Sequence, residues 1–232
     1  INLNKVSMKF RKEFDSIGSI NVPNDKYWGA STQRSKKYFD IGEIYVKKIL
    51  IKSIAVIKKA AAIVHKKENQ INTKIANVII KASDEIIKGK LDDNFPLKVW
   101  QTGSGTQTNM NANEVIANLA SAKLKDQISP NDEVNMSQSS NDTIPTAICI
   151  SALLDMKELL LPGLDVLIKE IDKKEAKLKG VVKTGTTHLM DAMPIEFSQE
   201  LSAWSAQLRG CKNSLNSSFK RLSELPQGGT AI

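Results

Sequence analysis

The stretch Trp100-Gln-Thr-Gly-Ser-Gly-Thr-Gln-Thr-Asn-Met-Asn-Ala-Asn-Glu114 contains two glycines, many hydroxyl and amide side chains, and no charge before its last residue. Apolar residues then recur at helical spacing over residues 115–120, so the polar stretch is predicted to lie where a helix begins. The N–H groups of a first helical turn lack partners within the helix, and the helix dipole is positive there. Glycine lets such a backbone approach a ligand closely. The stretch therefore predicts an anion site made of neutral donors.

An ordinary turn with an N-cap would have a similar composition, so this stretch alone leaves both interpretations open. Two further polar segments, residues 137–146 and residues 183–194, also precede apolar patterns at helical spacing. In the first of them, Asn141, Asp142 or Thr143 is the predicted helix cap, with Pro145 near the first turn. This recurrence favours the interpretation as a binding site.

The composition is that of a globular protein: 232 residues, of which 41% are hydrophobic and 25% charged. The net charge of +8 comes from lysines spread along helix faces, without a basic tract or interleaved aromatic residues, which argues against a nucleic-acid partner. No apolar run approaches the length of a membrane span, and the first twenty residues contain no signal-peptide core. We therefore expect a cytoplasmic protein with no membrane partner.

The cysteine and histidine residues show no metal-ligand spacing, so no metal is expected. Cys149 and Cys211 lie in apolar helical patterns and are predicted to be buried, reduced thiols. His65 lies near the end of an apolar helix and is interpreted as structural. His188 follows a Gly-Thr-Thr run in a predicted loop and precedes Asp191 by three residues; an imidazole side chain suits proton transfer near neutral pH.

Apolar periodicity predicts a mainly α fold. Helices are expected over residues 43–67 and 73–88, from the opening stretch to residue 125, from about residue 141 to 179, and over residues 197–225. Pro162 is predicted to kink or break the fourth of these helices. Residues 1–42 are predicted to be irregular, with an extended arm that turns at Pro23-Asn24 and at Gly29.

The last predicted helix has the clearest apolar stripe, which alternates steps of four and three residues (Phe197, Leu201, Trp204, Leu208, Cys211, Leu215). A stripe of this kind predicts a bundle of long helices, with partner helices from later in the chain or from other subunits. We therefore expect an N-terminal, mostly helical domain over residues 1–142, followed over residues 143–232 by the first part of a central long-helix bundle.

The polar segments restrict the possible chemistry. Residues 103–106 lack the lysine and the spacing of a phosphate loop, and no strand is predicted before them. Neutral donors together with one general acid or base suit a small carboxylate whose negative charge grows in the transition state. Moving a proton next to a carboxylate creates such an enolate-like species.

Three blocks of sequence carry a resemblance to a known family: VWQTGSGTQTNMNANEV (residues 99–115), PNDEVNMSQSSND (residues 130–142) and GTTHLMDA (residues 185–192). They resemble the fumarase/aspartase superfamily, and within it the class II (iron-independent) fumarate hydratases. Residues 22–29 and 228–231 fit the same pattern. Aspartase-like members tend to carry Thr at the position of Ser140 and Gln at that of His188, so both positions here are fumarase-like.

The resemblance implies reversible addition of water to fumarate, giving L-malate, without a cofactor. It implies that one subunit binds the dicarboxylate substrate through Ser104, Gly105 and Thr106. A second subunit would contribute Ser139, Ser140 and Asn141, and a third Thr187 and His188, with His188 in proton transfer or water positioning. The implied assembly is a homotetramer built around a shared helical bundle.

The sequence also departs from the family pattern. Ser129 stands where the family usually has His, in a secondary carboxylate site that also uses Asn131 and Asp132, and Thr186 stands where Arg is usual. The family's second half, which holds the flexible loop with the catalytic base, is not in this sequence, so we expect the 232 residues alone to be inactive. An aspartate ammonia-lyase-like enzyme and an inactive helical scaffold of the same superfamily remain alternatives.

Overall fold

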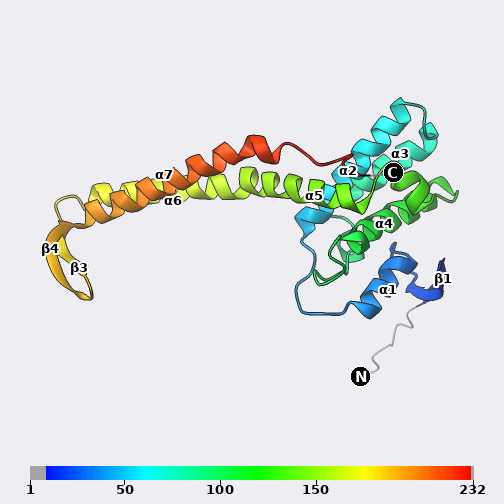
Figure 1. The fold of residues 1–232 in the computed structure, drawn as a ribbon, viewed down its shortest axis with the longest axis horizontal. Coiled ribbons are helices and arrows are strands. Elements are labelled where there is room, and N and C mark those ends of the chain that lie inside the picture. The colour runs from blue at the N-terminus through cyan, green and yellow to red at the C-terminus, as the bar shows by residue number, and fades with distance from the viewer. Residues whose placement is uncertain (1–8, 231–232) are drawn as a thin grey trace, which may run out of the picture. The chain divides into compact units, whose positions relative to one another are not determined.

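The computed structural model describes residues 9–230 and shows a mainly α fold, as predicted (Figure 1). Its helices are α1 (Ala30–Tyr38), α2 (Lys48–Lys67), α3 (Thr73–Ile87), α4 (Thr106–Leu124), α5 (Ser140–Asp155), α6 (Leu161–Lys177) and α7 (Phe197–Leu222). Two antiparallel hairpins add the strands β1 (Phe10–Asp15), β2 (Gly18–Pro23), β3 (Val182–Thr187) and β4 (Met190–Glu196). Shorter turns are η1 (Asp92–Asn94), η2 (Pro130–Val134) and η3 (Met156–Leu160).

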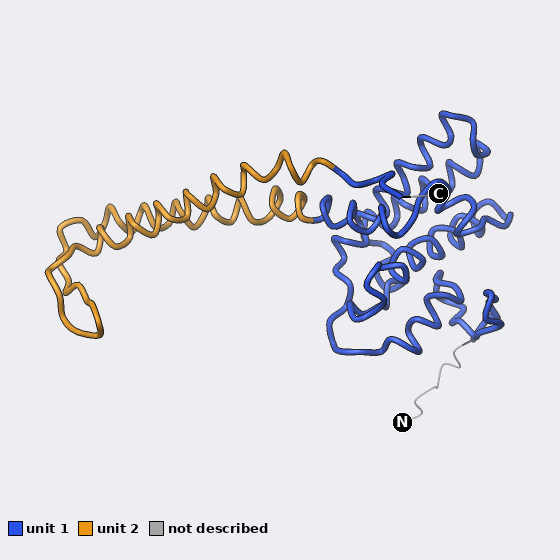
Figure 2. Tube along the Cα trace, in the orientation of Figure 1, with its two compact units in different colours: residues 1–151, 225–232 blue, residues 152–224 orange. Residues whose placement is uncertain are grey.

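The chain divides into two compact units (Figure 2). Unit 1 comprises the chain up to Ser151 together with the segment from Leu225 onward, and unit 2 comprises Ala152–Glu224. The predicted domain boundary between residues 142 and 143 stays a prediction. No helix within residues 9–230 combines the length and the apolar character needed to cross a membrane.

The core of unit 1 is aliphatic and lies between α2, α3 and α4. Each helix places an apolar residue inward every three or four positions, so that Ala55 of α2, Ile79 of α3 and Ile116 of α4 are fully buried. Burying a side chain the size of isoleucine stabilises the fold by about 1.5–3 kcal/mol. This core fixes the axis of α4, and with it the direction in which the opening stretch points.

Helix α2 begins later than predicted, at Lys48 instead of residue 43. The preceding residues are extended and pair with the approach to the opening stretch: the Val46 N–H donates to the Leu97 carbonyl at 3.0 Å, and the Val99 N–H donates to the Ile44 carbonyl at 2.9 Å. Side-chain periodicity does not reveal this pairing, because it is made entirely by backbone groups.

The N-terminal arm contains more regular structure than predicted. Strands β1 and β2 form a hairpin, and α1 follows it. Arg34 of α1 closes this arm: its guanidinium donates to Asp15 at 2.6 and 3.0 Å and to the Gly18 carbonyl at 2.8 Å. This ion pair lowers the pKa of Asp15. Arg34 is thus bound to a neighbouring carboxylate within the arm.

In unit 2, α6 packs against α7. The kink or break predicted at Pro162 is a π-helical segment, η3, which joins α5 to α6 without a gap, and Pro162 lies in the first turn of α6. Ile168 is the one large apolar side chain buried in the described part of this unit. Trp204 remains exposed, and so does Cys211, for which the prediction of burial is wrong. The physical reason is that a two-helix unit covers only one face of α7.

Candidate functional site

The opening stretch lies at the N-terminus of α4, as predicted. Gly105 occupies the N-cap position with a φ of 68°, a left-handed conformation that glycine adopts without strain. The hydroxyl oxygens of Ser104 and Thr106 lie 2.9 Å apart on either side of this glycine, and both residues are exposed. Amide side chains fix the loop, since Gln107 Oε1 accepts hydrogen bonds from the Thr102 N–H at 2.7 Å and from the Thr102 hydroxyl at 2.8 Å.

The second polar segment meets the first at the N-terminus of α5. The Ser140 hydroxyl lies 3.0 Å from that of Thr106, although 34 residues separate them in the chain. Three hydroxyl groups of one chain therefore gather where two helices begin, whereas the resemblance implied that Ser140 would come from a different subunit than Ser104 and Thr106. Each hydroxyl can donate to an anionic oxygen, and the positive ends of two helix dipoles favour negative charge at this point.

The cap of α5 differs from the prediction. Ser139 is the capping residue: its hydroxyl accepts from the Asn141 N–H at 3.2 Å, and the Asp142 carboxylate accepts from the Ser139 N–H at 3.0 Å. The predicted caps at residues 141–143 lie inside the helix, which begins at Ser140, so Pro145 lies in its second turn. The reciprocal serine and aspartate bonds account for the earlier start. Asn141, in the first turn of α5, is exposed.

The third polar segment forms a β-hairpin and not a loop. His188 and Leu189 connect β3 to β4 with positive φ angles of 50° and 60°, and Thr187 pairs with Met190 across the turn. Two successive positive φ angles are usual for Asn-Gly turns and are strained for His-Leu. His188 is exposed in unit 2, whereas the hydroxyl cluster belongs to unit 1.

The predicted secondary site centres on a capped turn. The Ser129 hydroxyl accepts from the N–H groups of Asn131 at 3.2 Å and Asp132 at 3.1 Å, and its own N–H donates to the Glu133 carboxylate at 2.6 Å. These backbone donors are already bound within the turn. Carboxylate binding here stays a prediction. Among the described residues, no three His, Cys, Asp or Glu side chains gather to form a metal site.

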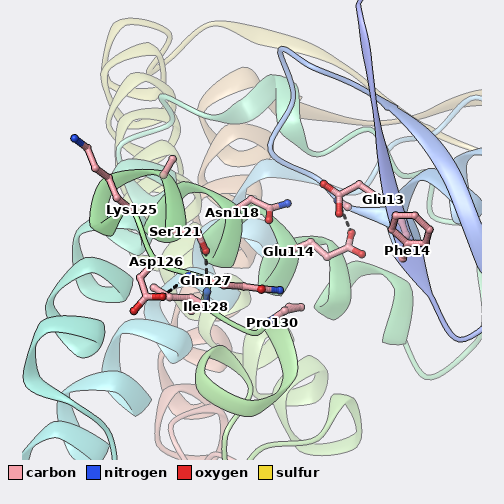
Figure 3. A pocket seen from close by; sticks show the side chains of 13 residues that line it. Glu13, Phe14, Glu114, Asn118, Ser121, Lys125, Asp126, Gln127, Ile128 and Pro130 are labelled. Atoms are coloured by element: carbon pink, nitrogen blue, oxygen red, sulfur yellow. Dashed lines mark hydrogen bonds between the residues drawn. The ribbon is translucent and has the colours of Figure 1, made fainter.

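Glu114 is buried on α4 and has a structural role that the sequence pattern did not predict. Its carboxylate accepts hydrogen bonds from the N–H groups of Gly29 at 2.9 Å, Ser31 at 2.8 Å and Thr32 at 3.1 Å, and from the Thr32 hydroxyl at 2.6 Å. It therefore binds the N-terminal turn of α1. Figure 3 shows Glu114 among the residues that line an adjoining cavity of about 630 Å³. The available signal in the sequence was that Glu114 is the one charged residue of the polar stretch and directly precedes the apolar residues of α4.

Alanine at position 105 is expected to destabilise the protein by about 1–3 kcal/mol, because its side chain makes the left-handed backbone unfavourable. A Cβ there would also lie 2.9 Å from Ile144 Cγ1 of α5. Urea unfolding of Gly105→Ala should show this loss. Gly103→Ala is the matched control, since a Cβ at Gly103 has no neighbour within 4 Å among the described residues. Equal stability of the two variants would contradict the proposed strain.

Comparison with known proteins identifies related chains. A family model described as "Lyase" matches residues 18–232. The class II fumarate hydratase of Campylobacter jejuni is 48% identical over 231 residues, covering 97% of this chain and 50% of that protein. The corresponding protein of Bacillus subtilis is 45% identical over 230 residues, covering 97% of this chain and 50% of the relative.

A solved structure agrees with these sequence relatives. The crystal structure of class II fumarase from Schistosoma mansoni matches with a TM-score of 0.91 at 40% identity, over 97% of this chain and 48% of that chain. The chain thus spans about half the length of the relatives that it matches.

Proposed function

Because this chain belongs to the lyase family, we propose that it carries part of the active site of a fumarate hydratase, which adds water reversibly to fumarate to give L-malate. The observation that supports this most strongly is the cluster of the Ser104, Thr106 and Ser140 hydroxyls where α4 and α5 begin. The identity of 45–48% with two class II fumarate hydratases supports the same reaction.

The hydroxyl cluster is proposed to bind one carboxylate of the substrate. Gly105 leaves the backbone accessible, and Ser139 and Asn141 complete the rim on the α5 side. Hydration passes through a state in which negative charge moves onto this carboxylate, and fixed dipoles stabilise that charge without reorganising. Because all of these donors are neutral, this part of the site would bind the carboxylate through hydrogen bonds and helix dipoles.

His188 is proposed to take part in proton transfer or to position the water, with Thr187 beside it. The strained turn that holds His188 supports this role, because backbone strain of this kind concentrates at functional positions. An imidazole exchanges protons readily near neutral pH, which suits a reaction that runs in both directions.

We propose that the active assembly is an oligomer, and specifically a homotetramer in the cytoplasm without nucleic-acid or membrane partners. The exposed apolar side chains of unit 2 support association. Phe197 and Trp204 are 38% and 49% exposed on α7. Exposed apolar side chains on one helix face favour packing against further helices. Cross-linking and light scattering would test the number of subunits.

A hybrid enzyme tests the reaction. Residues 1–232 would replace the matching half of the Bacillus subtilis relative, and fumarate consumption and malate formation would be followed. The hybrid should hydrate fumarate, whereas the same hybrid with Thr106→Val should lose about 10²-fold in kcat/KM, because a charge-stabilising donor is removed. Residues 1–232 alone are expected to be inactive, and substantial turnover by them would contradict that expectation.

The alternatives predict different outcomes for the same hybrid. An ammonia-lyase would release ammonia from aspartate and leave malate unchanged. A helical scaffold would assemble to the size of the relative and convert neither substrate. Either result, obtained with a correctly assembled hybrid, would overturn the proposed hydratase activity.

A further inference from the structure

Lys58 is a charged residue in the middle of the apolar face of α2. Its side chain is fully buried, which is exceptional for lysine. The Nζ atom donates a hydrogen bond of 2.8 Å to Asn135 Oδ1. A buried amino group costs several kcal/mol unless its polar contacts offset the loss of water. A methionine or leucine would fill the same space without that cost, so packing alone does not account for the amino group of Lys58.

Asn135 connects Lys58 to the loop before α5. Its Oδ1 also accepts from Asn109 Nδ2 and Asn113 Nδ2 of α4, both at 3.1 Å. Its Nδ2 donates to the Gln138 carbonyl at 3.0 Å. These contacts fix the orientation of the Asn135 amide: its oxygen faces three donors, and its nitrogen faces the Gln138 carbonyl. One side chain therefore ties α2 and α4 to the residue just before Ser139.

Asp142 fixes the other end of the same loop. It is fully buried, and its carboxylate accepts from the Ser139 N–H at 3.0 Å, from Gln227 Nε2 at 3.0 Å and from the Gly228 N–H at 3.0 Å. Burial lowers the pKa of Lys58 to about 7, and the charge of Asp142 acts in the opposite direction. Lys58 and Asp142 thus interact electrostatically, and they also contact the two ends of the same loop, residues 135–142.

We propose that Lys58 is a positioning residue: through Asn135 it holds residues 135–142, and so places the Ser139, Ser140 and Asn141 donors opposite Thr106. The identity of the ligand that these donors bind rests on the proposed function, whereas the placement of the donors by Lys58 does not. Lys58 does not touch the substrate. Its amino group instead sets the distance between the N-termini of α4 and α5, on which the hydroxyl cluster depends.

Amide hydrogen exchange of the 232-residue chain tests the positioning directly. Lys58→Met keeps the length of the side chain and removes the donor. Exchange of the amides of residues 136–142 should become about tenfold faster or more, while those of α3 keep their rates. Lys59→Met is the matched control: Lys59 neighbours Lys58 on α2 but pairs with Asp84 of α3 at 2.7 Å, so the loop should keep its rates.

A second variant covers the case in which Lys58→Met fails to fold. Asn135→Asp keeps the acceptor for Lys58 and favours the buried charge, but it replaces the donor to the Gln138 carbonyl. It should therefore release residues 136–142 while Lys58 stays in place. Unchanged loop exchange in a folded variant, or faster exchange throughout unit 1, would overturn the positioning role, since the second result indicates general destabilisation.

The hybrid enzyme supplies a separate kinetic readout. Lys58→Met should lower kcat/KM for fumarate about tenfold per folded enzyme, because displaced donors stabilise the transition-state charge less well. Lys59→Met should leave kcat/KM unchanged, and an unchanged kcat/KM in a folded, assembled Lys58→Met hybrid would contradict the positioning role. If no hybrid hydrates fumarate, the proposed function fails, whereas the exchange measurement still decides whether Lys58 positions the loop.

Discussion

Glu114→Ala is expected to lower the free energy of unfolding by roughly 3 kcal/mol or more, because it leaves the N–H groups of Gly29, Ser31 and Thr32 without their acceptor. Each unpaired buried donor costs about 1–3 kcal/mol. The start of α1 should lose its order first, since the carboxylate binds its first turn. Urea unfolding measures the total loss, and amide exchange of residues 29–32 locates it.

Asn118→Ala is the control for this prediction. Asn118 lies one turn further along α4 and makes a single neutral bond of 2.8 Å to the Tyr27 carbonyl, so about 1 kcal/mol is expected. A loss for Glu114→Ala no larger than that of the control would show that the N-terminal arm does not depend on the carboxylate.

The loss of folding stability on replacing Glu114 by alanine should also depend on pH. Burial raises the pKa of Glu114, although its hydrogen bonds oppose that shift. Between the unfolded pKa and the higher folded pKa, the folded state binds more protons, so wild-type stability falls as pH rises through this window. Glu114→Ala lacks this component. The stability difference between the two proteins should therefore be largest below the unfolded pKa and should narrow above it; a widening difference would contradict the shift.

His188→Asn in the hybrid enzyme is expected to lower kcat for fumarate hydration about 10²–10⁴-fold, the range for loss of a general acid or base. Asparagine tolerates a positive φ, so the turn between β3 and β4 should keep its geometry. The lower kcat would then be attributable to the missing imidazole. The measurement is the initial rate in both directions, from fumarate and from malate.

The same substitution at the other histidine is the control. His65 is buried in α2, and burial lowers its pKa. His65→Asn should reduce stability and leave kcat per folded enzyme unchanged within about twofold, since a structural role affects the amount of active protein alone. An unchanged kcat in His188→Asn would remove His188 from the mechanism.

The sequence contains strong information about the helices of both units. Apolar steps of three and four residues predict α2, α3, α4 and α7, with errors confined to their ends, because residues at this spacing share one face only on a helix. The opening stretch is also predicted at a helix start, because glycine and hydroxyl residues precede the stripe of α4. Local chemistry determines both features.

Other features depend on contacts that are distant in the sequence. The meeting of Thr106 with Ser140 follows from how α4 and α5 pack, which periodicity does not specify. The β3–β4 hairpin has no apolar alternation, because β3 is rich in threonine, β4 contains an aspartate and a proline, and both strands are largely exposed. Lys58 and Asp142 resemble surface residues in a linear sequence, since lysine and aspartate are seldom fully buried.

The bonds from Gln227 and Gly228 to Asp142 join two parts of unit 1 that lie 85 and 86 residues apart in the sequence. Unit 1 is therefore closed by its own contacts, whatever the length of the chain between its two segments. Seven residues added to each of α6 and α7 would lengthen both helices by about 10 Å and leave these bonds unchanged. Unit 2 could thus vary in length during evolution while the hydroxyl cluster of unit 1 is conserved.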